Sequence, residues 1–98
     1  MNIAGFTTKL VMVNNGSSAD ILYLPTYQQM KLDKDKLQPM DASLVGFTGD
    51  KVFLVGIVTL PITVGTYPKV VSKTVDFLAV NYHSAYNAII GLPTLNRL

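Results

Sequence analysis

Apolar and polar residues alternate along most of the chain with the two-residue period that is typical of β-strands. A first apolar run, Lys9–Val13, ends at the turn-forming residues Asn14–Gly16. A second run, Asp20–Leu24, is stopped by Pro25. The beginning of the chain therefore predicts two short strands separated by a polar turn.

The next segment changes character. Thr26–Met30 consists of residues that tolerate a helix, and it predicts one or two helical turns with Thr26 as the cap. Leu32–Ala42 is polar, contains Pro39 and carries four charges, which predicts a loop.

The pattern becomes sharper from Leu44 onward. Leu44–Val45 and Lys51–Val64 read as the two arms of a hairpin around a tip that glycines bracket. Gly56 and Pro61 predict a bulge or bend within the second arm. The apolar face of that arm consists of alternate residues, namely Leu54, Val58, Leu60, Ile62 and Val64.

The last third of the chain predicts two more strands and a helix. Gly65–Pro68 reads as a turn, Val70–Val80 as a strand, and Ala88–Gly91 as a buried apolar run. Pro93–Leu98 can start a helix, since proline is favoured in a first turn. We therefore expect an all-β fold, a single domain over residues 1–98, with six or seven short strands and one short helix near its C-terminal end.

Composition excludes several classes of protein. The chain has 98 residues, of which 49% are hydrophobic and 14% charged, so it is not intrinsically disordered. The longest apolar runs have only about four or five residues, which is too short to span a bilayer, and we expect no membrane partner. There is no cysteine, and His83 is the only histidine. Disulfide frameworks, Cys or His metal clusters and Ser-His or Cys-His nucleophiles therefore lack their parts, and we expect neither a metal nor a cofactor.

Charge and hydropathy bear on the partners. The net charge is +2, and the lysines around Asp33 and Asp35 alternate with these acids, so no basic patch for nucleic acid is formed. The mean hydropathy of +0.34 is high for a small soluble monomer and favours an oligomer.

Four blocks of sequence together resemble one family. Val13–Leu22 reads VNNGSSADIL, Leu44–Asp50 reads LVGFTGD, Val75–Leu78 reads VDFL, and Ser84–Asn96 reads SAYNAIIGLPTLN. Their content and order resemble the retropepsin-like aspartic proteases, most closely the protease segment of plant gypsy-class long-terminal-repeat retrotransposon polyproteins. The resemblance covers nearly the whole chain. It implies a retropepsin-like lobe, a closed barrel or sandwich with a flap hairpin and one short C-terminal helix.

In that family the first block carries the catalytic aspartate, and here Asn14 stands at its position. Two carboxylates, one from each lobe, share a proton in such enzymes: one activates water and the other donates to the scissile carbonyl. An amide has no titratable proton and cannot act as the base. We therefore expect the chain to be inactive, either as an engineered variant or as a natural inactive copy.

The resemblance also assigns the neighbouring positions. Asn15 would tie the two active-site loops together, and Gly16 would let the backbone pass close to the substrate. Ser17 and Ser18 would bind substrate backbone. The alternative is that these residues form only a polar turn.

Val45–Val52 resembles the flap that closes over an extended peptide by adding hydrogen bonds of the β type. Its alternative is an ordinary surface hairpin. The flap residues expected to contact the substrate are Val45, Gly46, Phe47, Thr48 and Gly49.

Other positions have smaller roles. Ala88–Gly91 resembles the element that packs beneath the catalytic loop, although Leu92 stands where relatives often carry Arg or Asp. Asp20 is expected to stabilise the active-site turn. His83 is expected in a loop, and Asp76 is not a replacement acid.

Because one lobe supplies one catalytic position, the resemblance implies a C2 homodimer that cleaves an extended peptide within a retroelement polyprotein. It also implies an intracellular protein, in the cytoplasm or in retroelement particles. Two other classes remain open: a non-catalytic domain that binds extended peptides, and a structural dimerisation module.

Overall fold

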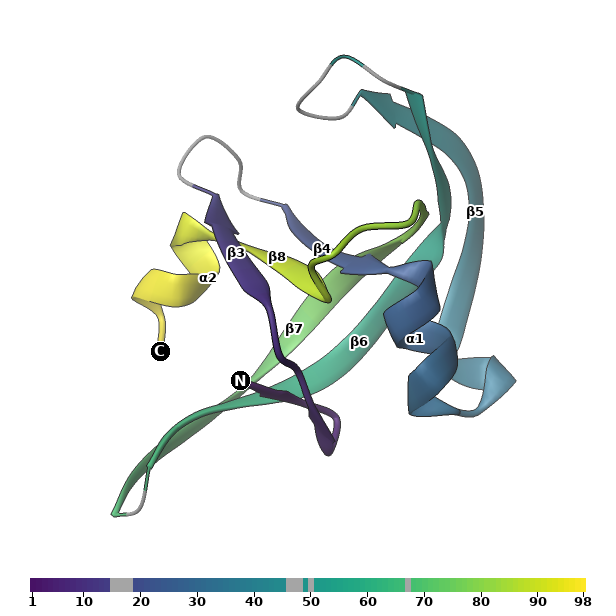
Figure 1. Ribbon diagram of the computed structural model, residues 1–98. Coiled ribbons are helices and arrows are strands. Elements are labelled where there is room, and N and C mark those ends of the chain that lie inside the picture. Colours follow the sequence, from purple (N-terminus) through teal and green to yellow (C-terminus); the bar gives the residue numbers. More distant parts are fainter. Residues whose placement is uncertain (15–18, 46–48, 50, 67) are drawn as a thin grey trace.

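A computed structural model describes residues 1–14, 19–45, 49, 51–66 and 68–98. Within these ranges eight strands form one sheet in the order β2-β1-β6-β7-β4-β8-β3, with β5 paired to β6 beside this path. The sheet curls into a half-barrel (Figure 1). The strands are β1 (Asn2–Ile3), β2 (Phe6–Thr7), β3 (Val11–Asn14), β4 (Asp20–Tyr23), β5 (Leu37–Val45), β6 (Lys51–Thr66), β7 (Lys69–Asn81) and β8 (Ala88–Gly91).

The long antiparallel pair β6–β7 forms the central part of the sheet. The alternation of apolar residues predicted for β6 is largely confirmed. On the expected apolar face of β6, four side chains are buried: Leu54, Val58, Leu60 and Ile62. Val64 is only half-buried, since β6 and β7 run on together past the rest of the sheet (Figure 1).

The bulge expected in β6 occurs at Gly56, where the pairing with β7 shifts between Leu54 and Gly56. At Pro61 there is no bulge, because Pro61 pairs in register with Thr74. The Pro61 carbonyl accepts the Ala4 N–H at 2.8 Å, away from β7. In an antiparallel strand the missing N–H of Pro61 would point the same way, so no bond to β7 is lost.

The segment Leu32–Ala42 was predicted to be a loop, and this prediction is wrong. It contains a 3-10 turn, η1 (Lys34–Lys36), and most of β5, which pairs with β6. The described side chains of β5 after Leu37 are exposed, so no apolar face marks the strand in the sequence. Pro39 is tolerated because β5 lies at an edge and its register shifts between Pro39 and Ala42.

Two short helices flank the sheet, one where helical turns were predicted over Thr26–Met30 and one near the C-terminal end. Helix α1 (Leu24–Met30) has Tyr23 as its N-cap and Pro25 in its first turn, so Pro25 starts a helix after β4. Thr26 is not the cap but a buried residue inside this helix. Helix α2 (Leu92–Asn96) has proline in its first turn, as predicted.

The predictions of a closed barrel and of short strands throughout are also wrong. The sheet is open, because β2 and β3 stand at opposite ends of the strand order. β6 has 16 residues and β7 has 13, which are long for strands. The N-terminal hairpin β1–β2, with positive φ at Ala4 and Gly5, was not expected.

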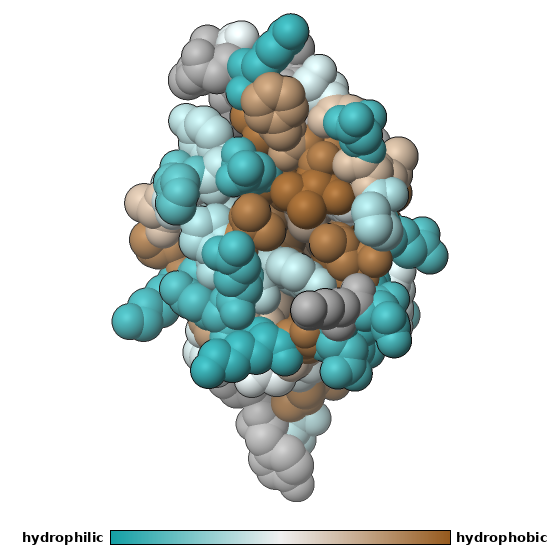
Figure 2. Space-filling view, turned by 90° about the vertical axis from the view of Figure 1, so that its right-hand side faces the viewer, coloured by the Kyte–Doolittle hydropathy of each residue, from teal (hydrophilic) through white to brown (hydrophobic). Residues whose placement is uncertain are grey.

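The core lies inside the curl of the sheet. Its buried residues come from five strands and are Ile3, Leu22, Val58, Leu60, Ile62, Val75, Phe77, Ala88 and Ile90. Tyr27, Met30 and Leu37 pack against this cluster without being fully buried. Figure 2 shows apolar side chains gathered in the middle of the face that carries β5 and α1, with polar side chains around them.

Candidate functional site

The candidate site is built where β3 ends. β3 and β4 follow one another along the chain, but β8 lies between them, parallel to β3 and antiparallel to β4. The β3–β8 register runs from Val11 opposite Ala88 to Asn14 opposite Gly91. All four residues of β8 are buried, so the end of β3 rests on a fixed strand.

Asp20 holds the other side of this arrangement. Its side chain is 6% exposed. Its Oδ1 accepts the Gly91 N–H at 2.8 Å, and its Oδ2 accepts the Thr94 hydroxyl at 2.6 Å. Arg97 Nη2 in turn donates to Thr94 Oγ1 at 3.2 Å. The carboxylate therefore joins the start of β4 to the junction between β8 and α2.

The expected stabilising role of Asp20 thus has a defined geometry. Charge-assisted hydrogen bonds to a backbone N–H and a hydroxyl satisfy a buried carboxylate without an ion pair. In the described residues, no buried side-chain nitrogen or oxygen is without a hydrogen-bond partner. Because both oxygens of Asp20 are engaged, this group serves the scaffold and is not available to replace an acid at position 14.

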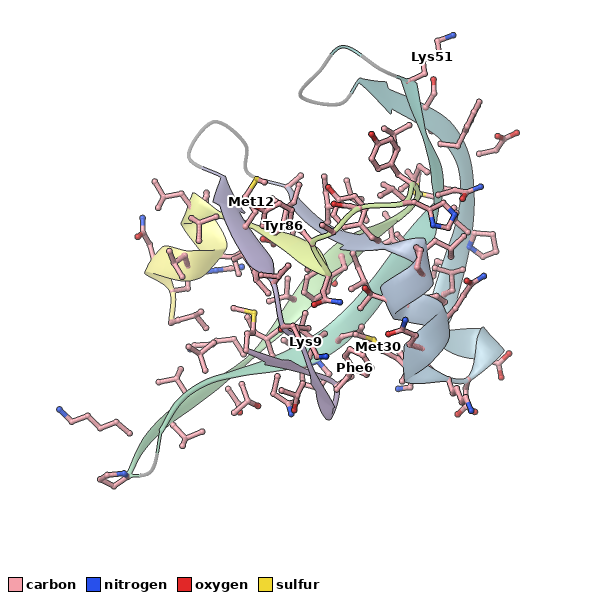
Figure 3. The ribbon with its side chains drawn as sticks, viewed as in Figure 1. Phe6, Lys9, Met12, Met30, Lys51 and Tyr86 are labelled. Atoms are coloured by element: carbon pink, nitrogen blue, oxygen red, sulfur yellow. The ribbon has the colours of Figure 1, made fainter. Side chains whose placement is uncertain are left out.

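The hairpin β5–β6 lies on the same side of the molecule as the end of β3. Pairing continues to Val45 opposite Lys51, which places the hairpin where the sequence predicted it. Figure 3 shows Met12 of β3 and Lys51 of β6 toward this common side. Gly49 is exposed with a φ of 84°, the left-handed conformation that a glycine tip permits.

Most predicted site residues lie outside the described residues. These are Asn15, Gly16, Ser17 and Ser18 after β3, and Gly46, Phe47 and Thr48 at the hairpin. The backbones of Asn14 and Val45 are described as the last residues of β3 and β5. The residues predicted after β3 and those predicted at the hairpin can therefore be located only by the ends of β3 and β5, the strands that lead into them.

Few other groups are candidates for chemistry. The described residues contain no cluster of three or more His, Cys, Asp or Glu side chains that could hold a metal ion. His83 is exposed in the coil between β7 and β8, as expected. Asp76 is exposed on β7 and accepts the Thr59 hydroxyl at 2.5 Å.

Sequence reasoning missed the role of Asn87, which lies just before β8. Its side chain bonds to the segment that leads into β3 and to α1, with partners 61 to 78 residues away in the chain. A signal was present, because a polar residue stands directly before the apolar run Ala88–Ile90.

Comparison with known proteins gave no match to any family model, curated protein or solved structure. Neither α1 nor α2, nor any other described segment, forms a helix long and apolar enough to cross a membrane.

Proposed function

We propose that the chain is one lobe of a retropepsin-like aspartic endopeptidase that Asn14 keeps inactive. Two copies would form a C2 homodimer, and with aspartate at position 14 in both copies this dimer would cleave extended peptides of a retroelement polyprotein without a metal or cofactor. The enzyme would act inside the cell, in the cytoplasm or in retroelement particles. One observation carries the proposal: the block Val13–Leu22 spans the end of β3 and the start of β4, and β8 holds Asn14 in register with Gly91.

The proposed peptide-bond hydrolysis depends on the two side chains of residue 14, one from each copy of the dimer. Two carboxylates within about 3 Å cannot both ionise, so they share one proton and titrate as a coupled pair. The ionised member takes a proton from the attacking water, and the protonated member donates to the carbonyl oxygen. With Asn14 in both copies, neither proton transfer has its acid or base.

The test is to restore the carboxylate. We expect Asn14→Asp to cleave extended peptides at least about 10²-fold faster than the parent chain, with a bell-shaped pH profile. Asn15→Asp is the matched control, because it introduces the same charge one residue along and should stay inactive. A peptide with a hydroxyl in place of the scissile carbonyl should inhibit Asn14→Asp as a transition-state analogue.

The proposal fails if folded Asn14→Asp cleaves no peptide of a broad panel across acid to neutral pH. Sedimentation of the same sample checks the homodimer. A variant that is active while it remains monomeric at assay concentration would contradict a site shared between two copies.

A second candidate function is favoured by Asn14 itself. A domain that has lost the base but kept its groove would bind extended peptides without cleaving them. In that case a peptide should slow amide exchange between Val45 and Lys51 in the parent chain, and Asn14→Asp should remain inactive. A dimer whose exchange no peptide changes would point instead to a structural dimerisation module.

A further inference from the structure

Asn87 makes three side-chain hydrogen bonds to two distant segments. Its Oδ1 accepts the backbone N–H groups of Lys9 at 2.9 Å and of Leu10 at 3.1 Å. Its Nδ2 donates to Thr26 Oγ1 at 3.0 Å. Figure 3 labels Lys9 and also Tyr86, which precedes Asn87 in the chain.

The backbone of Asn87 extends the same junction. Its N–H donates to the Leu10 carbonyl at 2.7 Å, and its carbonyl accepts the Tyr23 N–H at 3.2 Å. One residue therefore joins the approach to β3, the end of β4 and the first turns of α1 to the start of β8. Both ends of its amide group are satisfied, which also fixes the orientation of that group.

The hydrogen bonds of Asn87 are important because the β3–β8 ladder, which begins directly after them, is short. β3 and β8 pair over only four residues, from Val11 to Asn14. A slip of one residue would move every side chain of β3 to the opposite face. The two successive N–H groups of Lys9 and Leu10 meet Asn87 Oδ1 in one register only, so a slipped β3 would lose both bonds.

We propose that Asn87 is a positioning residue, which sets the register of β3 on β8 and so places residue 14 opposite Gly91. The proposal rests on the proposed function where it concerns catalysis, since residue 14 is the catalytic position there. Asn87 itself lies at the far end of the ladder and would not touch the substrate.

The experiment uses the Asn14→Asp protein with three further substitutions, compared one at a time. Asn87→Leu keeps the size of the side chain and removes its three hydrogen bonds. Asn87→Asp keeps the acceptor for Lys9 and Leu10, and the Thr26 hydroxyl can turn to donate to its second oxygen. Asn96→Leu is the control, because Asn96 is exposed on α2 and lies outside the β3–β8 ladder.

We expect Asn87→Leu to lower kcat by about 10²-fold, since a small displacement of a catalytic group is enough for that, while KM changes by less than about threefold. Amide exchange at Lys9 and Leu10 should accelerate at least about tenfold. Nuclear Overhauser contacts between the backbones of Val13 and Ile90 should be lost. Asn87→Asp should restore all three readouts, and Asn96→Leu should leave them unchanged.

The proposal is overturned if folded Asn87→Leu keeps both its kcat and the Val13–Ile90 contacts. If Asn14→Asp itself is inactive, the proposed function fails, and the backbone contacts and exchange rates alone decide the role of Asn87. If Asn87→Leu does not fold, Asn87→Asp decides: parental backbone contacts support the role of the acceptor, and their loss in a folded protein overturns it.

Discussion

At the scale of single residues, the most consequential buried polar group is the Asp20 carboxylate. Asp20 connects β4 to the β8–α2 junction through Gly91 and Thr94. Removing it would leave a buried N–H and a buried hydroxyl without their acceptor, and each such loss costs about 1–3 kcal/mol. Asp20 thus contributes to placing Gly91, the residue against which Asn14 is registered.

We therefore expect Asp20→Ala to lower the free energy of unfolding by about 2–5 kcal/mol, measured by urea denaturation. Asp76→Ala is the matched control. Its carboxylate is exposed and accepts the Thr59 hydroxyl at the surface, so the loss should stay below about 1 kcal/mol. Equal losses in the two variants would contradict the role that the geometry gives to Asp20.

At the scale of elements, the described part of the sheet pairs β5 with β6 alone. The two strands approach very closely at the bulge. A Cβ added to Gly56 would lie 2.4 Å from the Gln38 carbonyl oxygen, which is far below van der Waals contact. Because the obstacle is backbone, a side-chain rotation cannot relieve it. Gly56 therefore controls how closely the base of the β5–β6 hairpin is held.

Gly56→Ala should loosen β5 selectively. We expect a loss of more than about 2 kcal/mol in the free energy of unfolding, in the range of overpacking substitutions. Amide exchange should accelerate in β5, while the β4–β8 pairing keeps its protection. Gly5→Ala is the control. It also meets a cost, because its φ is 86°, but an added Cβ has no heavy atom within 4 Å, so its loss should be about 1 kcal/mol.

The predictability of these elements from sequence followed their burial. The alternation in β6 was readable because one face of the strand enters the core. β5 was missed because its described side chains after Leu37 face solvent, and it is a strand only through its backbone bonds to β6. Helix α1 was expected near its true place, but its start was misjudged because Pro25 can either end a strand or begin a helix.

The candidate site was predictable only as a set of local blocks. The polar turn after Val13 and the apolar run before Gly91 were both recognised in the sequence. In the structure, the strand that leads into this turn, β3, pairs with the strand formed by this run, β8. The bonds from Asn87 to Lys9 and from Asp20 to Thr94 were not predictable, because each joins residues more than 70 positions apart. Pairings of this kind depend on the strand order, which no local pattern contains.

At the scale of the whole molecule, the curled sheet depends on one central layer of side chains. Phe77 of β7 is fully buried, and it lies in register with Val58 of β6 on one side and Asp20 of β4 on the other. Phe77 thus lies where the strands of the long hairpin meet the strands that carry the candidate site. A cavity there would weaken both halves of the sheet together.

We expect Phe77→Ala to lower the free energy of unfolding by about 3–5 kcal/mol, a large part of the 5–15 kcal/mol typical of a whole domain. Phe53→Ala removes the same atoms from a side chain that is 60% exposed, and it should cost less than about 1 kcal/mol. Circular dichroism during urea unfolding measures both. Because all strands share one sheet, Phe77→Ala should move a single cooperative transition to lower urea. Two separate transitions would mean that the hairpin and the candidate site unfold independently, and would contradict the shared core.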